Sequence, residues 1–589
     1  MNDTSLPLAS LSTAEEEEIE HLYEERADHL SLEAFKENTV LAAGSEEWVK
    51  SLTASGAKLL IGPRGCGKTH LMRYAYSQCI ENKKLPFAIY ANFNRYYRLE
   101  PLLRRRPDAI SMFYTWVLSN TLIGLFNAIA ETSTNDLTEL DGEALLGNSR
   151  VEVEDIIGTL ERAKALSEEQ EALAASLTVD RIKNLIMRIT DIFDRKRAVL
   201  LMDDAALTLA PEFMAHFFDI FRALKATRIA PKASVYPATT EYGPTFHVDH
   251  EAERIFVWKS VTDGNYQSFM QDIAEKRFPD VLRIQEEIRA LLAYAAFGVP
   301  RSYMALVRSY NKAQIASRSS SASRQRWFNT VIEDFVGEKL KEYNSLAKKT
   351  PLLTSIIRVG GNCFSRIVTE VVEESQSLVD SSCRQIFIGI SVDSIQNEYI
   401  SRMFGLLEEA GLLYRYPKVS HGADRTYERF VPHLAALLEQ RAFSRKGAFS
   451  PKLAIEVLQR PDEKHPVRRS VTTLIDPAVI ASLTLDLPPC EACGAGRVES
   501  AKYCHNCGAP LTHVSTYERC MRTPWSEVPG LTPWQREKLS SASDLPKTIG
   551  EFLVLQDRGT ALRTIRNIGS KRAKTVIEIV ETFVDEFLS

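Results

Sequence analysis

The stretch Lys58-Leu-Leu-Ile-Gly-Pro-Arg-Gly-Cys-Gly-Lys-Thr-His70 determines how the rest of the chain is interpreted. A short apolar run over residues 59–61 predicts a strand, and the pattern of Leu71, Met72 and Ala75 predicts a helix after the glycines. The spacing between them is G-x-x-x-x-G-K-[ST], which is typical of a phosphate-binding loop in this strand–helix context. The residues expected to line it are Gly62, Pro63, Arg64, Gly65, Cys66, Gly67, Lys68, Thr69 and His70.

Each residue type in this loop has a physical reason. Glycines let successive backbone N–H groups turn inward around phosphates, and the following helix adds its positive N-terminal end. Lys68 would reach the β- and γ-phosphates of ATP, and the Thr69 hydroxyl would bind the accompanying Mg²⁺. The alternative is a chance glycine-rich turn, which the flanking strand and helix disfavour. Cys66 is either a redox switch or, as we favour, a small residue tolerated in the turn.

Composition sets broad limits. The chain has 589 residues, of which 44% are hydrophobic and 25% charged, so several ordinary globular domains are expected. The net charge of −5 means that nucleic-acid binding would depend on local basic patches, such as the residues around 301–328 and 441–470, unless these are simply solvated faces. No apolar run is expected to reach the roughly 20 residues of a membrane span. The acidic residues 15–18 lack the order of a signal peptide, which favours the prokaryotic cytosol or nucleoid.

The order of predicted elements indicates a multidomain chain. Residues 1–44 form an acidic, partly helical extension, and residues 45–260 alternate strand and helix as in a parallel sheet, with a helical insertion over 100–190 whose polar part, 132–170, resembles an inserted or mobile loop. Strands are expected at 58–61, 87–92, 198–202, 234–238 and 254–258.

The strand at 198–202 leads into two carboxylates. Asp203 would hold the shell of the magnesium ion, and Asp204 would orient or deprotonate an attacking water. An apolar strand that ends in Asp-Asp is weak evidence alone, because many strands end at a polar turn, and the upstream phosphate loop strengthens it. Asp204 is shorter than a glutamate at that position, which suggests slow hydrolysis or a switch that mainly holds ATP.

Two further positions complete the predicted site. The hydroxyls of Thr239 and Thr240, after the fourth strand, would contact the γ-phosphate or the water, or else cap a turn. The sequence Gly298-Val-Pro-Arg301 opens a helix, and its arginine either serves the site or lies on an ordinary helix surface.

The order of these motifs over residues 45 to about 330 resembles the AAA+ ATPases, and within them the origin-recognition and replication-initiator clade. The resemblance implies an α/β P-loop core, a helical lid over 261–330, and a γ-phosphate contact for Arg301 that couples nucleotide state to lid angle. It also implies oligomers with an arginine finger, for which Arg254, Arg228 and Arg222 are candidates that fit the family pattern poorly.

Residues 331–440 predict a winged helix (α+β). An amphipathic helix over 399–411 precedes two strands, 412–418 and 425–431, which is the helix-then-wing order that initiator ATPases carry after the lid. If it binds DNA, Arg402, Lys418 and Arg425 are the candidate contacts, whereas many winged helices contact protein instead. Residues 441–489 are expected to be a basic linker with some local structure.

Four of the nine cysteines form the pattern C-x₂-C-x₁₀-C-x₂-C over residues 490–510. In a cytosolic chain this spacing favours a metal over disulfides, and a closed shell of four thiolates is typical of a structural zinc. The predicted ligands are Cys490, Cys493, Cys504 and Cys507, and the segment resembles a zinc ribbon. Whether the ribbon binds nucleic acid or protein stays open.

The tail, 525–589, is expected to be a small all-α domain. Residues 562–576 resemble a helix-hairpin-helix, with Asn567 where the family has glycine, and with residues 549–553 they are similar to the C-terminal domain of the RNA polymerase α subunit. Asparagine tolerates the left-handed backbone that this turn needs. The resemblance implies phosphate contacts by Lys571, Arg572 and Lys574, and the alternative is a helical interaction module.

Two hypotheses follow. The first is a DNA-associated AAA+ ATPase in which bound ATP controls how DNA or a protein partner is engaged, with oligomerisation through the core and no membrane association. The second is a nucleotide-gated switch or sensor that acts through protein partners, for example in a bacterial anti-phage defence or mobile-element system. A helicase or nuclease subunit finds no supporting motif.

Overall fold

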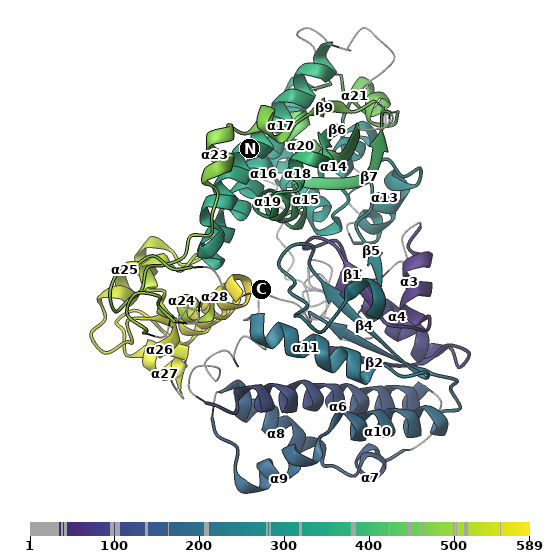
Figure 1. The fold of residues 1–589 in the computed structure, drawn as a ribbon, viewed down its shortest axis with the longest axis vertical. Helices are drawn as coiled ribbons and strands as arrows, with labels where there is room; N and C mark the ends of the chain where they lie inside the picture. Colours follow the sequence, from purple (N-terminus) through teal and green to yellow (C-terminus); the bar gives the residue numbers. More distant parts are fainter. Residues whose placement is uncertain are drawn as a thin grey trace, which may run out of the picture.

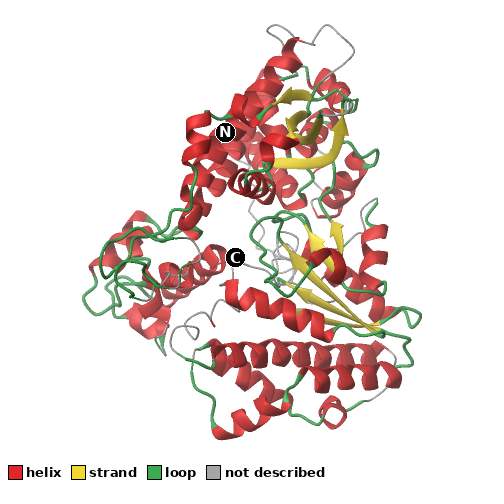
Figure 2. Cartoon of the chain, in the orientation of Figure 1, coloured by secondary structure: helices red, strands yellow, loops and turns green. Residues whose placement is uncertain are grey.

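A computed structural model gives the fold (Figures 1 and 2). It describes residues 44–94, 106–135, 140–162, 164–204, 211–277, 284–316, 321–377, 385–422, 425–443, 450–460, 465–498, 503–509, 516–553 and 557–588, with Phe35, Lys36, Thr39, Leu99, Val281, Ala501, Leu511 and Leu555. The expected N-terminal extension, 1–44, lies outside the described residues apart from four of them.

The first region is a five-stranded parallel sheet in the order β2-β3-β4-β1-β5. Its strands are β1 (Lys58–Ile61), β2 (Phe87–Asn92), β3 (Ala198–Asp203), β4 (Ile229–Val235) and β5 (Glu253–Phe256). Every residue of β1, β3 and β4 is buried, as expected for inner strands of a parallel sheet covered on both faces. The parallel α/β sheet predicted for residues 45–260 is therefore present.

The helices of this region are α3 (Glu46–Thr53), α4 (Lys68–Glu81), α6 (Ala109–Asn135), α7 (Gly142–Leu146), α8 (Arg150–Glu161), α9 (Glu168–Ser176), α10 (Val179–Ile192), α11 (Pro211–Leu224) and α12 (Val248–Glu251). Ile182, Leu185, Ile186 and Ile189 recur at helical spacing, so they lie on one side of α10. This apolar side is buried. The polar stretch 132–170, expected to be an insertion or mobile loop, forms α7, α8 and the start of α9 in its described part.

Helix α6 corrects one expectation. We expected no apolar run near the length of a membrane span. Among the described residues, however, one helix, α6, is long and apolar enough to cross a membrane. It packs against α8, α10, α11 and β2, and 72% of its most apolar window is buried inside the molecule. Its apolar length therefore serves as a packing surface between the sheet and the helices drawn at the bottom of Figure 1.

A second hydrophobic core unites the expected lid with the region after it and includes buried residues from Trp258 to Leu483. The lid helices are α13 (Tyr266–Arg277), α14 (Glu286–Ala295) and α15 (Pro300–Ala316). The next helix, α16 (Ser321–Lys349), runs through the boundary expected at residue 330, so lid and following region are continuous there.

The region after the lid contains a four-stranded sheet in the order β7-β8-β6-β9. Helix α17 (Thr354–Ser377) precedes β6 (Ile388–Ser391), and after α18 (Val392–Ile395) comes α19 (Glu398–Glu409), followed by the hairpin β7 (Leu413–Ser420) and β8 (Thr426–Pro432) and by α20 (Leu434–Glu439). The helix and the two strands expected over 399–431 are thus present in that order.

The stretch expected to be a basic linker, 441–489, is more ordered than predicted. Its described residues form α21 (Pro451–Leu458), β9 (Val467–Arg469), α22 (Val471–Leu474) and α23 (Pro477–Ser482). Strand β9 pairs in parallel with β6, and Val457, Leu474 and Leu483 are buried in the second core. The sequence has weak periodicity here because these helices and strands are short. Each is stabilised by packing against the second core, which a local sequence pattern does not reveal.

The C-terminal helices form a lobe at the left of Figure 1, and its buried residues belong to the same hydrophobic cluster as those of the first region. The helices of this lobe are α24 (Thr516–Arg522), α25 (Pro533–Ser541), α26 (Ile549–Leu553), α27 (Arg558–Arg563) and α28 (Ser570–Leu588). Trp525 anchors the lobe, because its ring lies 4.9 Å from that of Phe552 and its Nε1 donates to the Pro546 carbonyl at 2.7 Å.

Candidate functional site

The loop between β1 and α4 has the backbone that a phosphate cradle needs. Gly65 and Gly67 have φ angles of 80° and 98°, in the left-handed region that favours glycine. A Cβ on Gly62 would lie 2.7 Å from the Cys66 Sγ, so this close approach also requires glycine. Cys66 is buried, and burial raises the pKa of its thiol, which favours the interpretation as a small packing residue over a redox switch.

Lys68 points back over this loop. Its Nζ donates to the carbonyls of Gly62 at 2.7 Å and Pro63 at 3.1 Å, and it lies 4.1 Å from the centre of the Tyr236 ring. The side chain is almost fully buried, so its charge is held by carbonyl dipoles and an aromatic face. An anion bound in the loop would offer this ammonium a stronger partner than neutral carbonyls.

Asp203 lies at the carboxyl end of β3 and is fully buried. Its carboxylate accepts hydrogen bonds from the hydroxyls of Tyr90 and Ser234, both at 2.9 Å, and from that of Thr69. Burial raises the pKa of this carboxyl, while these hydrogen bonds lower it. A buried carboxylate joined to the Thr69 hydroxyl is the donor set that Mg²⁺ prefers, so the residues present fit the predicted ion.

Asp204 follows with a φ of 50°, a left-handed conformation that is uncommon for a residue other than glycine. Its backbone N–H donates to Asp203 Oδ1 at 3.0 Å and to Ser234 Oγ at 2.8 Å. These two hydrogen bonds hold the backbone of Asp204 in the turn that follows the strand. Strained backbone of this kind clusters at functional sites.

The two threonines after β4 have different roles. Thr240 Oγ1 accepts a hydrogen bond from the Tyr236 N–H at 2.9 Å. Thr240 therefore caps a turn, which was the alternative to a phosphate contact. Thr239 instead donates its hydroxyl, at 2.8 Å, to Glu409 at the end of α19. The fourth strand was expected over 234–238, whereas β4 ends at Val235, so both threonines lie in the following loop.

Arg301 reaches the phosphate loop from the lid. A Cβ on Gly65 would lie 3.1 Å from the Arg301 Cβ, and the Arg301 charge lowers the pKa of Cys66 against the effect of burial. Gly298 makes this approach possible, because its φ is 75° and a Cβ there would lie 2.1 Å from the Lys259 carbonyl oxygen. The Gly298 N–H donates to the Tyr266 hydroxyl at 2.9 Å, which fixes the start of α15.

The two remaining loop positions flank the cradle. Burial raises the pKa of Tyr236, and the positive charges of Lys68 and Arg64 both lower it. His70 lies with its ring 5.0 Å from that of Phe35, and burial, with the charges of Arg277 and Arg73, lowers the pKa of His70 to about 4. His70 is therefore neutral at physiological pH and adds no charge to the site.

The structure thus gathers the sequence-predicted residues from four elements at one edge of the sheet. Because β1, β3 and β4 are parallel, the loops after their carboxyl ends meet there. Sequence reasoning missed Tyr90, Ser234, Tyr236 and Glu409. Ser234 was signalled by a hydroxyl on a buried strand beside β3, whereas nothing local marks Glu409.

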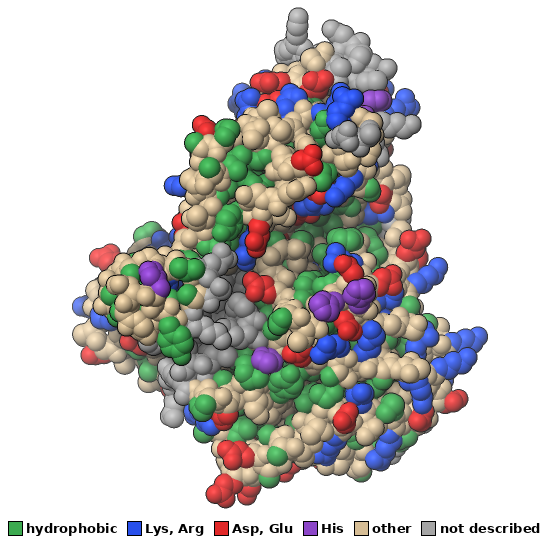
Figure 3. All heavy atoms as spheres, viewed as in Figure 1, with side chains coloured by type: hydrophobic (Ala, Val, Ile, Leu, Met, Phe, Trp, Pro, Cys, Tyr) green, Lys and Arg blue, Asp and Glu red, His purple; other side chains and the backbone are tan. Residues whose placement is uncertain are grey.

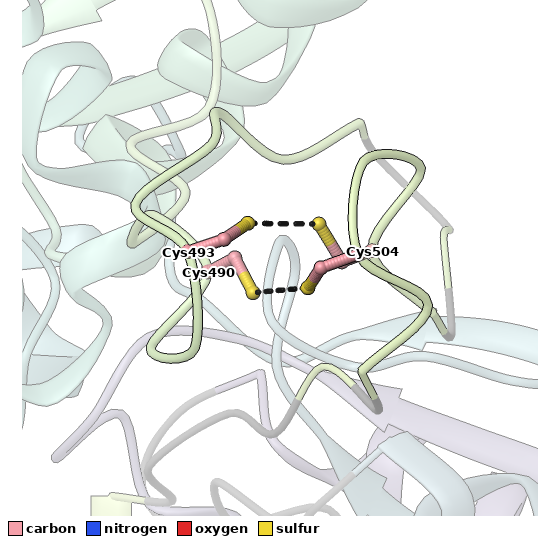
Figure 4. A group of neighbouring side chains, drawn as sticks. Cys490, Cys493 and Cys504 are labelled. Atoms are coloured by element: carbon pink, nitrogen blue, oxygen red, sulfur yellow. Dashed lines mark hydrogen bonds between the residues drawn. The ribbon is translucent and has the colours of Figure 1, made fainter.

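Four cysteine side chains converge in the segment 490–509 (Figure 4). The Sγ atoms of Cys490 and Cys507 are 3.6 Å apart, as are those of Cys493 and Cys504, and all four lie within 4.8 Å of one another. Thiolates 2.3 Å from a tetrahedral zinc are about 3.8 Å apart, so this set could bind zinc.

The two cysteine knuckles are near copies of each other. The N–H of Gly494 donates to the Cys490 carbonyl at 2.7 Å, and that of Gly508 to the Cys504 carbonyl at 2.9 Å. Both glycines have a φ of 70°. The repeated turn explains why a glycine follows each cysteine pair, since the backbone must reverse after the second thiol.

The predicted DNA contacts divide by location. Arg402 lies on α19 and is 3.5 Å from the Glu241 carboxylate of the first region, so in this arrangement it faces the core. Lys418, in the hairpin, is 57% exposed and pairs with Glu428 at 3.3 Å, and Arg425 is exposed. Acidic and basic side chains are interspersed on the face drawn in Figure 3.

The basic residues of the tail lie on the first turns of α28. Lys571, Arg572 and Lys574 are exposed. The Arg572 guanidinium stacks 5.3 Å from the Trp534 ring and donates to the Asn567 carbonyl at 2.7 Å, while Lys574 pairs with Glu578 at 3.8 Å. Asn567 has a φ of 74°, which confirms the left-handed turn expected there.

The three candidate arginine fingers pair within the chain. Arg254 lies 3.0 Å from the Asp249 carboxylate, Arg228 lies 2.6 Å from that of Asp191, and Arg222 donates to the Thr245 carbonyl at 2.9 Å. Each therefore has a local structural role.

No protein-family model and no curated protein matches the chain. Solved structures that resemble it include the Walker-type ATPase of Pyrococcus abyssi, with a TM-score of 0.32 and 12% identity over 67% of this chain and 94% of that one. Another is the Orc1 protein of Aeropyrum pernix in complex with DNA, with a TM-score of 0.26 and 14% identity over 68% of this chain and 92% of that one. Structural likeness at such TM-scores does not indicate a function. The proposed function is therefore based on the residues of this chain.

Proposed function

We propose that the chain is an ATP-binding and ATP-hydrolysing protein of the AAA+ type. The observation that supports it best is the hydrogen bond between the Thr69 hydroxyl and the buried Asp203, beside a loop that holds Lys68. Three groups with distinct roles in nucleotide binding come from β1–α4 and β3, far apart in sequence, and meet at one sheet edge. A chance glycine-rich turn would not bring a buried carboxylate to the threonine of its loop.

The proposed mechanism assigns each residue a task. Lys68 would exchange its two carbonyl partners for phosphate oxygens, and Thr69 and Asp203 would hold a Mg²⁺ ion, which would neutralise phosphate charge. Asp204 accepts the proton of the attacking water, and Arg301, beside Gly65, stabilises the charge that develops on the phosphoryl group. Tyr90 and Ser234 keep Asp203 oriented through their hydroxyls.

Binding of Mg·ATP, measured by calorimetry on the full chain, tests this proposal. Lys68→Ala removes the ammonium of the cradle and is expected to weaken binding at least about 100-fold, by analogy with the loss of a hydrogen bond to a charged group and of its Coulomb term. Lys84→Ala is the matched control, because Lys84 is exposed beyond the end of α4 and should leave binding unchanged. Equal affinity in both variants would contradict the site.

We further infer an association with DNA, supported by the exposed basic residues at the start of α28 and on the hairpin. The helix and hairpin of 399–431 would be a winged helix, the cysteine segment a zinc ribbon, and the turn at Asn567 a helix-hairpin-helix. The eight described cysteines are not joined to one another in disulfides, which fits a reducing cytosol.

One observation favours the second hypothesis, a switch that acts through protein partners. Helix α19, which would enter a DNA groove, instead faces the nucleotide site through Arg402 and Glu409. Turnover of ATP with and without duplex DNA separates the two hypotheses. A change in turnover with DNA supports the first, whereas identical turnover and no DNA binding in the presence of ATP would support the switch.

A further inference from the structure

Glu409, the last residue of α19, brings a carboxylate from the region after the lid into the predicted nucleotide site. Its Oε2 accepts from the N–H groups of Ala238 at 3.0 Å and Thr239 at 2.8 Å, and its Oε1 accepts the Thr239 hydroxyl at 2.8 Å. Two successive backbone N–H groups and a hydroxyl make a concave donor set of the kind that binds anions. Glu409 fills this donor set completely.

The rest of α19 holds Glu409 in place. A Cβ on Gly405, one helical turn earlier, would lie 3.1 Å from the Ala238 Cβ, so the helix backbone lies directly against the loop after β4. Arg402 pairs with Glu241 of the same loop at 3.5 Å. After the helix, a Cβ on Gly411 would lie 3.9 Å from the Cβ of Pro63 in the phosphate loop. Helix α19 thus contacts both loops of the site.

Glu409 interacts electrostatically with Lys68 of the phosphate loop. Burial raises the pKa of this carboxyl, whereas its three hydrogen bonds and the positive charge of Lys68 lower it. Lys68 is the residue that a phosphate loop directs at the β- and γ-phosphates. The Lys68 Nζ lies 4.1 Å from the centre of the ring of Tyr236, which begins the loop whose N–H groups Glu409 accepts from, so a terminal phosphate held by Lys68 would approach this carboxylate, and two anions there repel each other.

We propose that Glu409 is a specificity-determining residue that makes docking of α19 and binding of a nucleoside triphosphate mutually exclusive, while a diphosphate is tolerated. A γ-phosphate held by Lys68 would compete with Glu409 for the N–H groups of Ala238 and Thr239, so a triphosphate would displace α19 when it binds. Release of α19 would then free Arg402 for another partner. The inference rests on the proposed function, since it takes the phosphate loop to be a nucleotide site.

The test compares the affinities of the full chain for Mg·ADP and for Mg·AMP-PNP, a triphosphate analogue that is not hydrolysed, by calorimetry. In Glu409→Ala the affinity for AMP-PNP is expected to rise about 5- to 150-fold, the usual range for coupling between two sites, with ADP affinity nearly constant. Glu409→Gln keeps an acceptor without the charge and should show part of the rise. Glu398→Ala is the control, because Glu398 is exposed at the start of the same helix.

The outcomes separate the inference from the proposed function. If Glu409 only supports the loop after β4, Glu409→Ala will lower both affinities or leave their ratio unchanged, and the inference is overturned while the nucleotide site stands. If the wild type and all variants bind neither nucleotide, the nucleotide site fails and the inference fails with it. Only a selective gain for the triphosphate supports the role of Glu409.

Discussion

At the scale of single residues, the site depends on groups whose partners come from distant parts of the chain. The sequence predicts Lys68, Thr69 and Asp203 because each belongs to a local motif, and in the structure Thr69 bonds to Asp203 while Lys68 lies over the same loop. It does not predict Glu409 or Tyr90, since a glutamate at a helix end and a tyrosine in a strand are common, and only tertiary contact makes them part of the site.

Another buried residue gives a prediction at this scale. His433 packs near the rings of Phe297 and Phe335, with ring centres 4.9 and 5.7 Å away, and its Nδ1 accepts the Ala435 N–H at 3.2 Å. Burial, with a smaller effect of Lys339, lowers the pKa of His433 to about 3. The unfolded chain therefore binds this proton first, so the stabilising contribution of neutral His433 is complete above about pH 6.5 and declines as pH falls toward 3.

His433→Asn keeps a cap on α20 and removes the titration. Between pH 7 and pH 5 the wild type is expected to lose about 2 kcal/mol of stability more than this variant, because one proton is taken up on unfolding. Melting temperatures across this pH range measure the difference. Parallel curves for the two proteins would show that His433 titrates normally in the folded chain.

At the scale of elements, strands with strong apolar patterns are predicted well and short or interrupted ones are not. Strand β4 starts five residues before its predicted position because Pro231 and Lys232 break its pattern. Lys232 is tolerated inside the sheet because its Nζ donates to the Ala54 carbonyl at 2.8 Å, and burial lowers its pKa to about 7. Strand β9 is three residues long, and only its pairing with β6 makes it a strand.

The turn into α15 is predicted to require glycine. In Gly298→Ala the Cβ would meet the Lys259 carbonyl at 2.1 Å in a left-handed backbone, so we expect a loss of about 3 kcal/mol in unfolding free energy. Gly264→Ala is the control, because a Cβ there meets nothing within 4 Å. Chemical denaturation of the two variants checks this, and equal stability would mean that the lid adjusts freely at Gly298.

The cysteine knuckles are predicted to hold about one zinc per chain. Elemental analysis of the purified protein should find it, and Cys490→Ser should lose it, because three thiolates leave the tetrahedral shell open. Cys363→Ala, a buried cysteine outside the knuckles, should keep the metal. Zinc content that is equal in the two variants, or absent from the wild type, would refute the site.

At the scale of the whole molecule, the chain joins a parallel α/β region, a second core shared by lid and hairpin region, and a C-terminal lobe (Figure 1). Contacts of α19 link the second core to the loop after β4 and to Pro63 in the proposed nucleotide site, so a shift of these loops would act directly on the helix that precedes the hairpin. The order of these regions follows from sequence motifs, whereas their mutual docking depends on side chains without a motif.

DNA association is predicted to depend on the start of α28. Replacing Lys571, Arg572 and Lys574 by alanine should reduce the slope of log affinity against log salt by about 2 to 3, because up to three fewer phosphates are neutralised. The control replaces Lys50, Lys84 and Lys196, which are exposed on the first region. Fluorescence anisotropy with a labelled duplex at several salt concentrations measures both slopes, and an unchanged slope in the first variant would place DNA elsewhere.

The central claim, that ATP is hydrolysed at the carboxyl edge of the parallel sheet, is tested most directly by phosphate release from Mg·ATP. The wild-type chain is expected to release phosphate, and Asp204→Asn to lose at least about 100-fold in turnover while still binding ATP, because the proton acceptor is gone. Undiminished turnover in Asp204→Asn, or turnover that persists in Lys68→Ala, would contradict this account of the site.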